Sequence, residues 1–268
     1  MQLGRFGLTV DPGGFASAAE LEQLGFTTLW IVGGQLDRLD RLAELLDATE
    51  RAVVGSAIIP PDVYDAATVS AFYHRAESST PGRLLVGVGS PHSERPLAAV
   101  GRYADELDGG GVPLERRVLA AFGPRALDVA RDRFGGAMPA LLTPEYVTLA
   151  RERVGPDRVL AVGLYAVLDH DAEAARTTAR GPLDFLSTLP AYVKSLRRQG
   201  FSESSVTGLS DDLVDALVAT GGPDDIAARA HLLRAAGADH VHLTVLHDAH
   251  QPAGVDAARL LAPALAGG

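Results

Sequence analysis

The chain alternates between short, uninterrupted apolar runs and longer stretches in which apolar residues recur at helical spacing. A run with no polar residue suits a strand buried on both faces, as in a parallel sheet covered by helices. Residues 36–50, with leucines at 36, 39, 42, 45 and 46, are typical of the amphipathic helices between such runs. The pattern predicts eight strands, at residues 3–10, 27–32, 52–59, the run that opens at Leu84, 117–122, 137–142, 158–168 and 239–246.

Eight strands that alternate with helices predict the α/β class and a (β/α)8 (TIM) barrel, because strand–helix–strand units form parallel, right-handed crossovers. The span 172–233 is too long for one crossover, so we expect a helical insertion between strands seven and eight. A doubly wound open sheet is the alternative, but no nucleotide fingerprint follows the first strand. No shift in composition marks a second domain, and we expect residues 1–268 to form one.

Composition and charge argue against several classes of function and of binding site. The net charge of −10 and the lack of a basic stripe argue against nucleic-acid binding and against attraction to anionic lipid. The sequence has no cysteine, which excludes disulfides, thiolate metal sites and a cysteine nucleophile. Residues 1–6 lack a basic segment followed by an apolar core, and no apolar run reaches membrane-spanning length. We therefore expect a cytoplasmic protein.

The stretch Arg83–Ser93 carries the first candidate site. Its apolar run ends in Gly87 and Gly89, which let a ligand or another backbone approach closely. The hydrogen-bonding and titratable residues Ser90 and His92 follow at once. Barrel enzymes place their sites at the carboxyl ends of strands, so this stretch is either such a site or a core strand followed by an ordinary turn.

A second candidate site lies where the fifth predicted strand runs into Gly123 and Pro124. Proline is favoured in the first turn of a helix, and the free N–H groups of that turn bind anions. The guanidinium of Arg125 could add positive charge. The alternative is that these residues only make a tight turn from strand to helix.

The histidines give a weaker signal. His240 and His242 share one face of the last predicted strand, a spacing that a pair of metal ligands could use. No carboxylate accompanies them in a metal-binding pattern, and hydrogen bonds from the rings to the backbone are the simpler explanation. We expect no metal site.

Seven stretches of the sequence matter when they are taken in order: residues 24–30 (LGFTTLW), 55–60 (GSAIIP), 81–89 (PGRLLVGVG), 120–125 (AAFGPR), 189–192 (LPAY), 200–201 (GF) and 235–241 (AAGADHV). Together they resemble the luciferase-like monooxygenase superfamily, most of all its oxidoreductases that use the deazaflavin coenzyme F420. The resemblance extends over nearly the whole chain.

The resemblance implies a cofactor ring over the carboxyl ends of the strands. Ser56 and Ala57 would match the non-prolyl cis peptide that bulges against the ring. Gly89 and Ser90 would flank the ring, and the backbone of Gly123, Pro124, Arg125 and Ala126 would hold the cofactor's phosphate.

The chain departs from the better-known deazaflavin dehydrogenases at the positions that move protons. Gly33-Gly34 stands where they carry an Asp-His pair after the second strand, and His92 where they carry a glutamate after the fourth. His92 is our candidate proton donor, with Glu94 as the second catalytic residue; Asp62 and Tyr64 are the further candidates.

The resulting hypothesis is an oxidoreductase that transfers hydride between F420 and a small organic substrate, as a homodimer by analogy with the family. The first alternative is an FMN-dependent monooxygenase. The second is a degenerate barrel that binds a flavin, or nothing, without catalysis. A lyase or isomerase acting on a phosphorylated substrate is a weaker possibility, because no carboxylate or lysine is a strong candidate inside the barrel.

Overall fold

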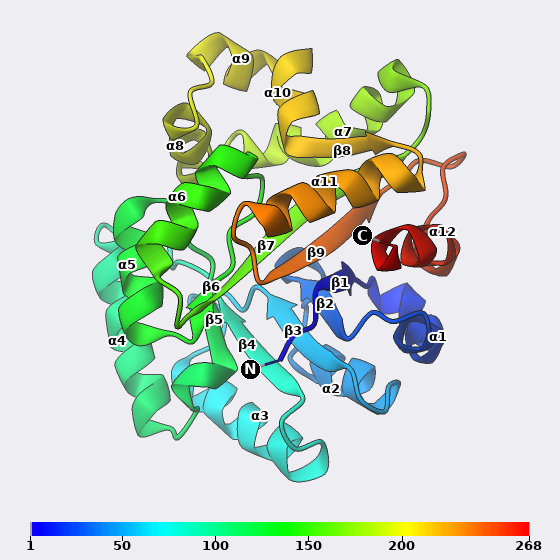
Figure 1. Ribbon diagram of the computed structural model, residues 1–268. Coiled ribbons are helices and arrows are strands. Elements are labelled where there is room, and N and C mark those ends of the chain that lie inside the picture. The colour runs from blue at the N-terminus through cyan, green and yellow to red at the C-terminus, as the bar shows by residue number, and fades with distance from the viewer. Residues whose placement is uncertain (1, 268) are drawn as a thin grey trace.

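Eight parallel strands close into a barrel in the computed structural model, which describes residues 2–267 (Figure 1). Each strand is hydrogen-bonded to its neighbours in the order β1-β2-β3-β4-β5-β6-β7-β9, and β9 returns to β1. The strands are β1 (Phe6–Thr9), β2 (Thr28–Val32), β3 (Val53–Ala57), β4 (Leu84–Val88), β5 (Arg117–Leu119), β6 (Gly136–Ala137), β7 (Val159–Leu168) and β9 (His240–Leu246). The predicted TIM barrel is confirmed.

Helices surround the barrel, as Figure 1 shows. They are α1 (Ala18–Gln23), α2 (Asp40–Asp47), α3 (Ala66–Ser79), α4 (Pro96–Gly109), α5 (Pro124–Arg133), α6 (Pro144–Val154), α11 (Pro223–Ala235) and α12 (Gly254–Ala266). Short 3-10 helices lie at η1 (Pro12–Ser17), η2 (Gly33–Gln35) and η3 (Leu114–Arg116). None of the helices described within residues 2–267 is long and apolar enough to cross a membrane.

The insertion between β7 and β9 differs in part from the prediction. It begins with α7 (Ala172–Leu186), α8 (Pro190–Arg198), α9 (Glu203–Gly208) and α10 (Asp211–Leu217), of which α8, α9 and α10 lie at the top of Figure 1. A ninth strand follows, β8 (Val218–Gly221), which pairs in parallel with the last four residues of β7. Because β8 leads directly into α11, the final part of the span predicted as extra helices is itself a strand–helix unit.

Strand lengths also differ from the predictions. The fifth and sixth strands end at Leu119 and Ala137, so half of the predicted range 117–122 and all but one residue of 137–142 form loops at the carboxyl ends of the strands. These loops continue the apolar composition of their strands, which is why the pattern did not separate the two.

Three apolar clusters organise the interior. The largest lies between barrel and helices, and includes Leu8 and Leu243 from the outward faces of β1 and β9. A smaller cluster fills the barrel itself, with Trp30, Leu85, Val118, Met138 and Ala161 at its centre. The third cluster packs the insertion helices against the carboxyl end of β7.

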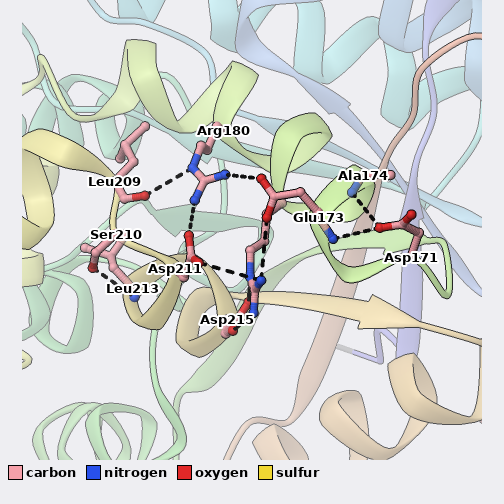
Figure 2. A network of polar contacts seen from close by, with 10 residues as sticks. Asp171, Glu173, Ala174, Arg180, Leu209, Ser210, Asp211, Leu213 and Asp215 are labelled. Atoms are coloured by element: carbon pink, nitrogen blue, oxygen red, sulfur yellow. Dashed lines mark hydrogen bonds and ion pairs between the residues drawn. The ribbon is translucent and has the colours of Figure 1, made fainter.

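An ion-pair network ties α7 to α10 within the insertion. Arg176 of α7 forms a two-pronged contact with Asp215, at 2.9 and 2.8 Å. Figure 2 shows Arg180 of α7 between Glu173 and Asp211, both of which it contacts. The network joins α7 to α10 beside the carboxyl end of β7.

Candidate functional site

The carboxyl ends of β2, β3 and β4 meet around one non-prolyl cis peptide bond, between Ala57 and Ile58. The prediction placed this bond one residue earlier, between Ser56 and Ala57, and was wrong in that detail. Glycines of the two neighbouring segments adjoin Ile58. A Cβ on Gly33 would lie 2.6 Å from the Ile58 carbonyl oxygen, and one on Gly89 would lie 2.3 Å from Ile58 Cδ1. Gly33 and Gly89 therefore make room for the Ile58 segment.

The hydroxyl of Ser56 is hydrogen-bonded to the backbone of the neighbouring strand. Its Oγ donates to the Gly87 carbonyl oxygen at 3.0 Å and accepts from the Gly87 N–H at 2.8 Å, in a fully buried position. These bonds tie β3 to β4 and use the hydroxyl's single donor and one of its two lone pairs. Of the four predicted ring contacts, Ala57, Gly89 and Ser90 lie at the ends of the strands, and only Ser90 among them is exposed.

The loops after β3 and β4 bring His92 to Asp62. The Asp62 carboxylate oxygen Oδ2 accepts the backbone N–H of His92 at 2.7 Å and lies 2.9 Å from His92 Nδ1. These contacts, with the backbone bond the larger cause, lower the pKa of Asp62. The His92 side chain is 93% exposed, so its ring is held by one edge while the rest faces solvent. Nδ1 is the donor toward a carboxylate, which leaves Nε2 directed outward.

Glu94 is not joined to this pair. Its side chain is exposed and makes no hydrogen bond or ion pair with any residue between 2 and 267. Tyr64 also points elsewhere, since its hydroxyl donates to the Leu36 carbonyl oxygen at 3.5 Å. Among the candidates named from the sequence, Asp62 is the one that the structure brings to His92.

The amino end of α5 is not capped by a side chain. Gly123 is the N-cap in an extended conformation, with no side chain capping the helix, and Pro124 is the first helical residue. The N–H groups of the first turn have no acceptor within a helix, and the helix dipole adds partial positive charge there. The four predicted residues Gly123, Pro124, Arg125 and Ala126 thus form a free helix terminus at the carboxyl end of β5.

Arg198 at the end of α8 adds a positive charge that sequence reasoning missed. Its Nη1 lies 3.0 Å from the position of a Cβ on Gly123. Arg198 forms no ion pair with any of the described residues 2–267. A cavity of about 450 Å³ adjoins it, lined by α5, α6 and α8 residues that include Pro124, Leu127 and Tyr146. The only local signal in the sequence was the Arg197-Arg198 pair, which nothing links to residue 123.

His240 and His242 lie inside the barrel and serve its core. Trp30 Nε1 donates to His240 Nε2 at 3.1 Å, and His240 Nδ1 donates to the Gly4 carbonyl oxygen at 2.9 Å. The His242 ring lies 4.9 Å from the Trp30 ring. Burial lowers the pKa of His240 to about 4 and that of His242 to about 3, so both rings are neutral at pH 7. Both nitrogens of His240 are used, and residues 2–267 contain no group of three potential ligands that could hold a metal.

Comparisons with known proteins place this geometry in a known fold. No protein-family model matches the sequence, and no curated protein matches it. Among solved structures, the chain is similar to an F420-dependent secondary alcohol dehydrogenase in complex with an F420–acetone adduct. The identity is 16% and the TM-score 0.72, and the match covers 97% of this chain and 98% of that one.

Two further solved structures have the same fold. One is the coenzyme F420-dependent tetrahydromethanopterin reductase from Methanopyrus kandleri, at 15% identity and a TM-score of 0.76, covering 98% of each chain. The other is the oxygenating constituent of 3,6-diketocamphane monooxygenase from Pseudomonas putida in complex with FMN, at 13% identity and a TM-score of 0.66, covering 97% of this chain and 98% of that one. At these identities the likeness is one of fold. The chain has the parallel α/β barrel fold that these solved structures share.

Proposed function

We propose that the protein is an oxidoreductase that transfers hydride between coenzyme F420 and a small organic substrate. The observation that carries the proposal is that a helix terminus without a capping side chain, beside an arginine, and a polar pair occupy one rim of the barrel. The proposed anion site is the α5 terminus beside Arg198, and the pair is Asp62–His92. The F420-dependent solved structures support the choice of cofactor.

The residues at this rim fit a deazaflavin or a flavin. Gly89 and the Ala57–Ile58 peptide would lie against the ring, with Ser90 at its edge. The N–H groups at the start of α5 and the Arg198 guanidinium would hold the phosphate, since charged donors bind phosphate oxygens more strongly than neutral ones do. When bound and reduced, a deazaflavin supplies a hydride to an organic acceptor.

His92 is the residue that we assign to proton transfer. An imidazole that donates through Nδ1 to a carboxylate keeps a fixed orientation and tautomer, and its other nitrogen is then available to substrate. Asp62 is the orienting residue, because its carboxylate holds both the backbone and the ring of His92. The exposed Glu94 lies in the same loop as His92, before α4, and this position is the basis for proposing it as a catalytic residue.

Spectral titration of the purified protein with F420 and, separately, with FMN tests the proposal. We expect saturable binding of F420, with absorbance changes that a Gly123→Asp variant loses. Binding of FMN alone would replace the assignment with that of an FMN-dependent monooxygenase. Binding of neither cofactor would favour a degenerate barrel.

We further propose that the protein acts in the cytoplasm as a homodimer on a small-molecule substrate. Light scattering during size-exclusion chromatography measures the mass of the particle in solution. A monomer at all concentrations would contradict the dimer.

A further inference from the structure

The inward faces of β7 and β9 form a wall across the barrel from the proposed cofactor site. Gly163 and Tyr165 of β7 pair with His242 and Thr244 of β9. A Cβ on Gly163 would lie 2.9 Å from His242 Nε2, which places this face of β7 inside the barrel. Side chains two apart on a strand share a face, so Tyr165 lies one layer further toward the carboxyl end, beside Thr244.

The strand order sets this wall opposite the proposed position of the cofactor ring. Going around the barrel, β7 is four strands from β3 in either direction, and β3 ends at the Ala57–Ile58 peptide. A molecule bound between the two walls would therefore meet the cofactor ring on the β3 side and Tyr165 on the β7 side.

A second tyrosine, Tyr192, reaches the same rim from the insertion. Its ring lies 4.5 Å from the ring of Phe122, at an angle of 46°, just before the amino end of α5. Tyr165 and Tyr192 pack at the edge of the same apolar cluster. The two phenols thus combine a flat apolar surface with polar ends.

Both hydroxyls are without a partner in the part of the chain that the structure describes. Neither the Tyr165 nor the Tyr192 hydroxyl hydrogen-bonds to any residue between 2 and 267, and neither oxygen is sealed from solvent. The nearby Thr9 and Thr244 hydroxyls bond to each other at 2.8 Å. Burial raises the pKa of both phenols, so they stay protonated donors. Both hydroxyls are therefore available to donate a hydrogen bond to a bound molecule.

We propose that Tyr165 and Tyr192 bind the substrate, and that the substrate is a flat, largely apolar organic molecule with an acceptor oxygen, such as an aromatic ketone. The position of the substrate relative to the cofactor rests on the proposed function, whereas the binding of such a molecule to the two phenols does not. Tyr165 and Tyr192 are specificity-determining residues in this assignment.

Two probes of similar size test the proposal. Acetophenone has a flat ring and a ketone oxygen, and ethylbenzene lacks that oxygen. Saturation-transfer NMR titrations measure the affinity of each probe for the F420-loaded and the cofactor-free protein. We expect Tyr165→Phe and Tyr192→Phe each to weaken acetophenone binding about three- to tenfold, as loss of one neutral hydrogen bond does, and to leave ethylbenzene binding unchanged.

The matched control is Tyr73→Phe, which removes a phenol hydroxyl from α3, outside the barrel. It should change the affinity for neither probe, and circular dichroism should show that all three variants fold. Unchanged acetophenone binding in both rim variants would overturn the proposal, as would an equal loss of both probes. A loss of F420 affinity in the rim variants would assign the phenols to the cofactor instead. Failure of F420 to bind the wild-type protein contradicts the proposed function alone, because the cofactor-free titration still tests the two tyrosines.

Discussion

The carboxylate of Asp62 holds His92 twice, through its backbone N–H at 2.7 Å and through its ring Nδ1 at 2.9 Å. The two residues come from the loops after β3 and β4, so this contact joins neighbouring loops at the rim of the barrel. A histidine oriented in this way presents one free ring nitrogen to a bound substrate.

Loss of either member of this pair should slow turnover without weakening the cofactor's binding. We expect His92→Gln to lower the rate of oxidation of reduced F420, with an accepted ketone or aldehyde, by about 10²-fold, which is typical for a general acid. Asp62→Asn should lower it by a smaller factor, because the ring remains but loses its orienting charge. Stopped-flow absorbance measures the rate, and fluorescence titration the affinity for F420.

The control for this pair is His74→Gln. His74 lies on α3 and its ring contacts the Gly110 carbonyl oxygen at 2.7 Å, away from the rim. Its variant should turn over at the wild-type rate. A His92 variant with an unchanged rate would remove His92 from the proposed proton transfer.

A negative charge at the start of α5 should weaken binding of any phosphate-bearing cofactor. In Gly123→Asp, the new carboxylate would repel the phosphate and occupy Arg198, whose Nη1 lies 3.0 Å from the Cβ position. We expect at least about tenfold weaker binding, as for loss of a charge-assisted hydrogen bond. Arg198→Gln should weaken binding by a similar factor. Equilibrium titration checks both variants, and wild-type affinity in folded Gly123→Asp protein would show that the phosphate binds elsewhere.

The Gly33-Gly34 segment supports a prediction in which neighbouring residues serve as test and control. In Gly33→Ala, the new Cβ would lie 2.6 Å from the Ile58 carbonyl oxygen and 3.0 Å from the Ile58 nitrogen, so backbone must move. We expect the free energy of unfolding to fall by about 1–3 kcal/mol, the usual cost of overpacking. Gly34→Ala meets nothing within 4 Å and should change it by less than about 0.5 kcal/mol. Urea unfolding compares them, and equal effects would contradict the close packing of Gly33 on Ile58.

Because His240 and His242 are buried, we expect the free energy of unfolding to fall in acid. His240 has an ordinary pKa of 6.5 in the unfolded chain and about 4 in the folded one, because burial disfavours the charged ring. Between these values the unfolded chain binds the proton and the folded one does not. The contribution of His240 is therefore complete above pH 6.5 and is lost as the pH falls toward 4.

At about 1.4 kcal/mol per pKa unit, this loss from His240 is on the order of 3 kcal/mol. Urea unfolding at about pH 7.5 and about pH 4.5 measures it. His240→Asn should be less stable than the wild type at the higher pH, since Trp30 loses its acceptor, and should lose less stability on acidification. An equal loss in both proteins would show that His240 does not titrate on unfolding.

Much of the architecture could be read from the sequence because barrel strands buried on both faces leave uninterrupted apolar runs. The sequence pattern did not predict β8, because Val218–Gly221 is short and directly follows a helix. Its strand structure depends on pairing with Tyr165–Leu168 of β7. In the site, the glycines and Gly123-Pro124 could be predicted from the sequence because their backbone properties are local. The position of Arg198 and the Asp62–His92 bond could not be predicted, because each depends on the contact between two segments.

The sequence by itself therefore determined the order of the eight barrel strands, the barrel and the candidate rim residues, since the burial pattern and turn residues are properties of neighbours along the chain. Only the tertiary structure decided that Ile58 lies between Gly33 and Gly89, that Arg198 lies over Gly123, and that Tyr165 faces the barrel interior across from β3. The physical reason is that these relationships depend on strand register and helix packing, which bring together residues far apart in sequence.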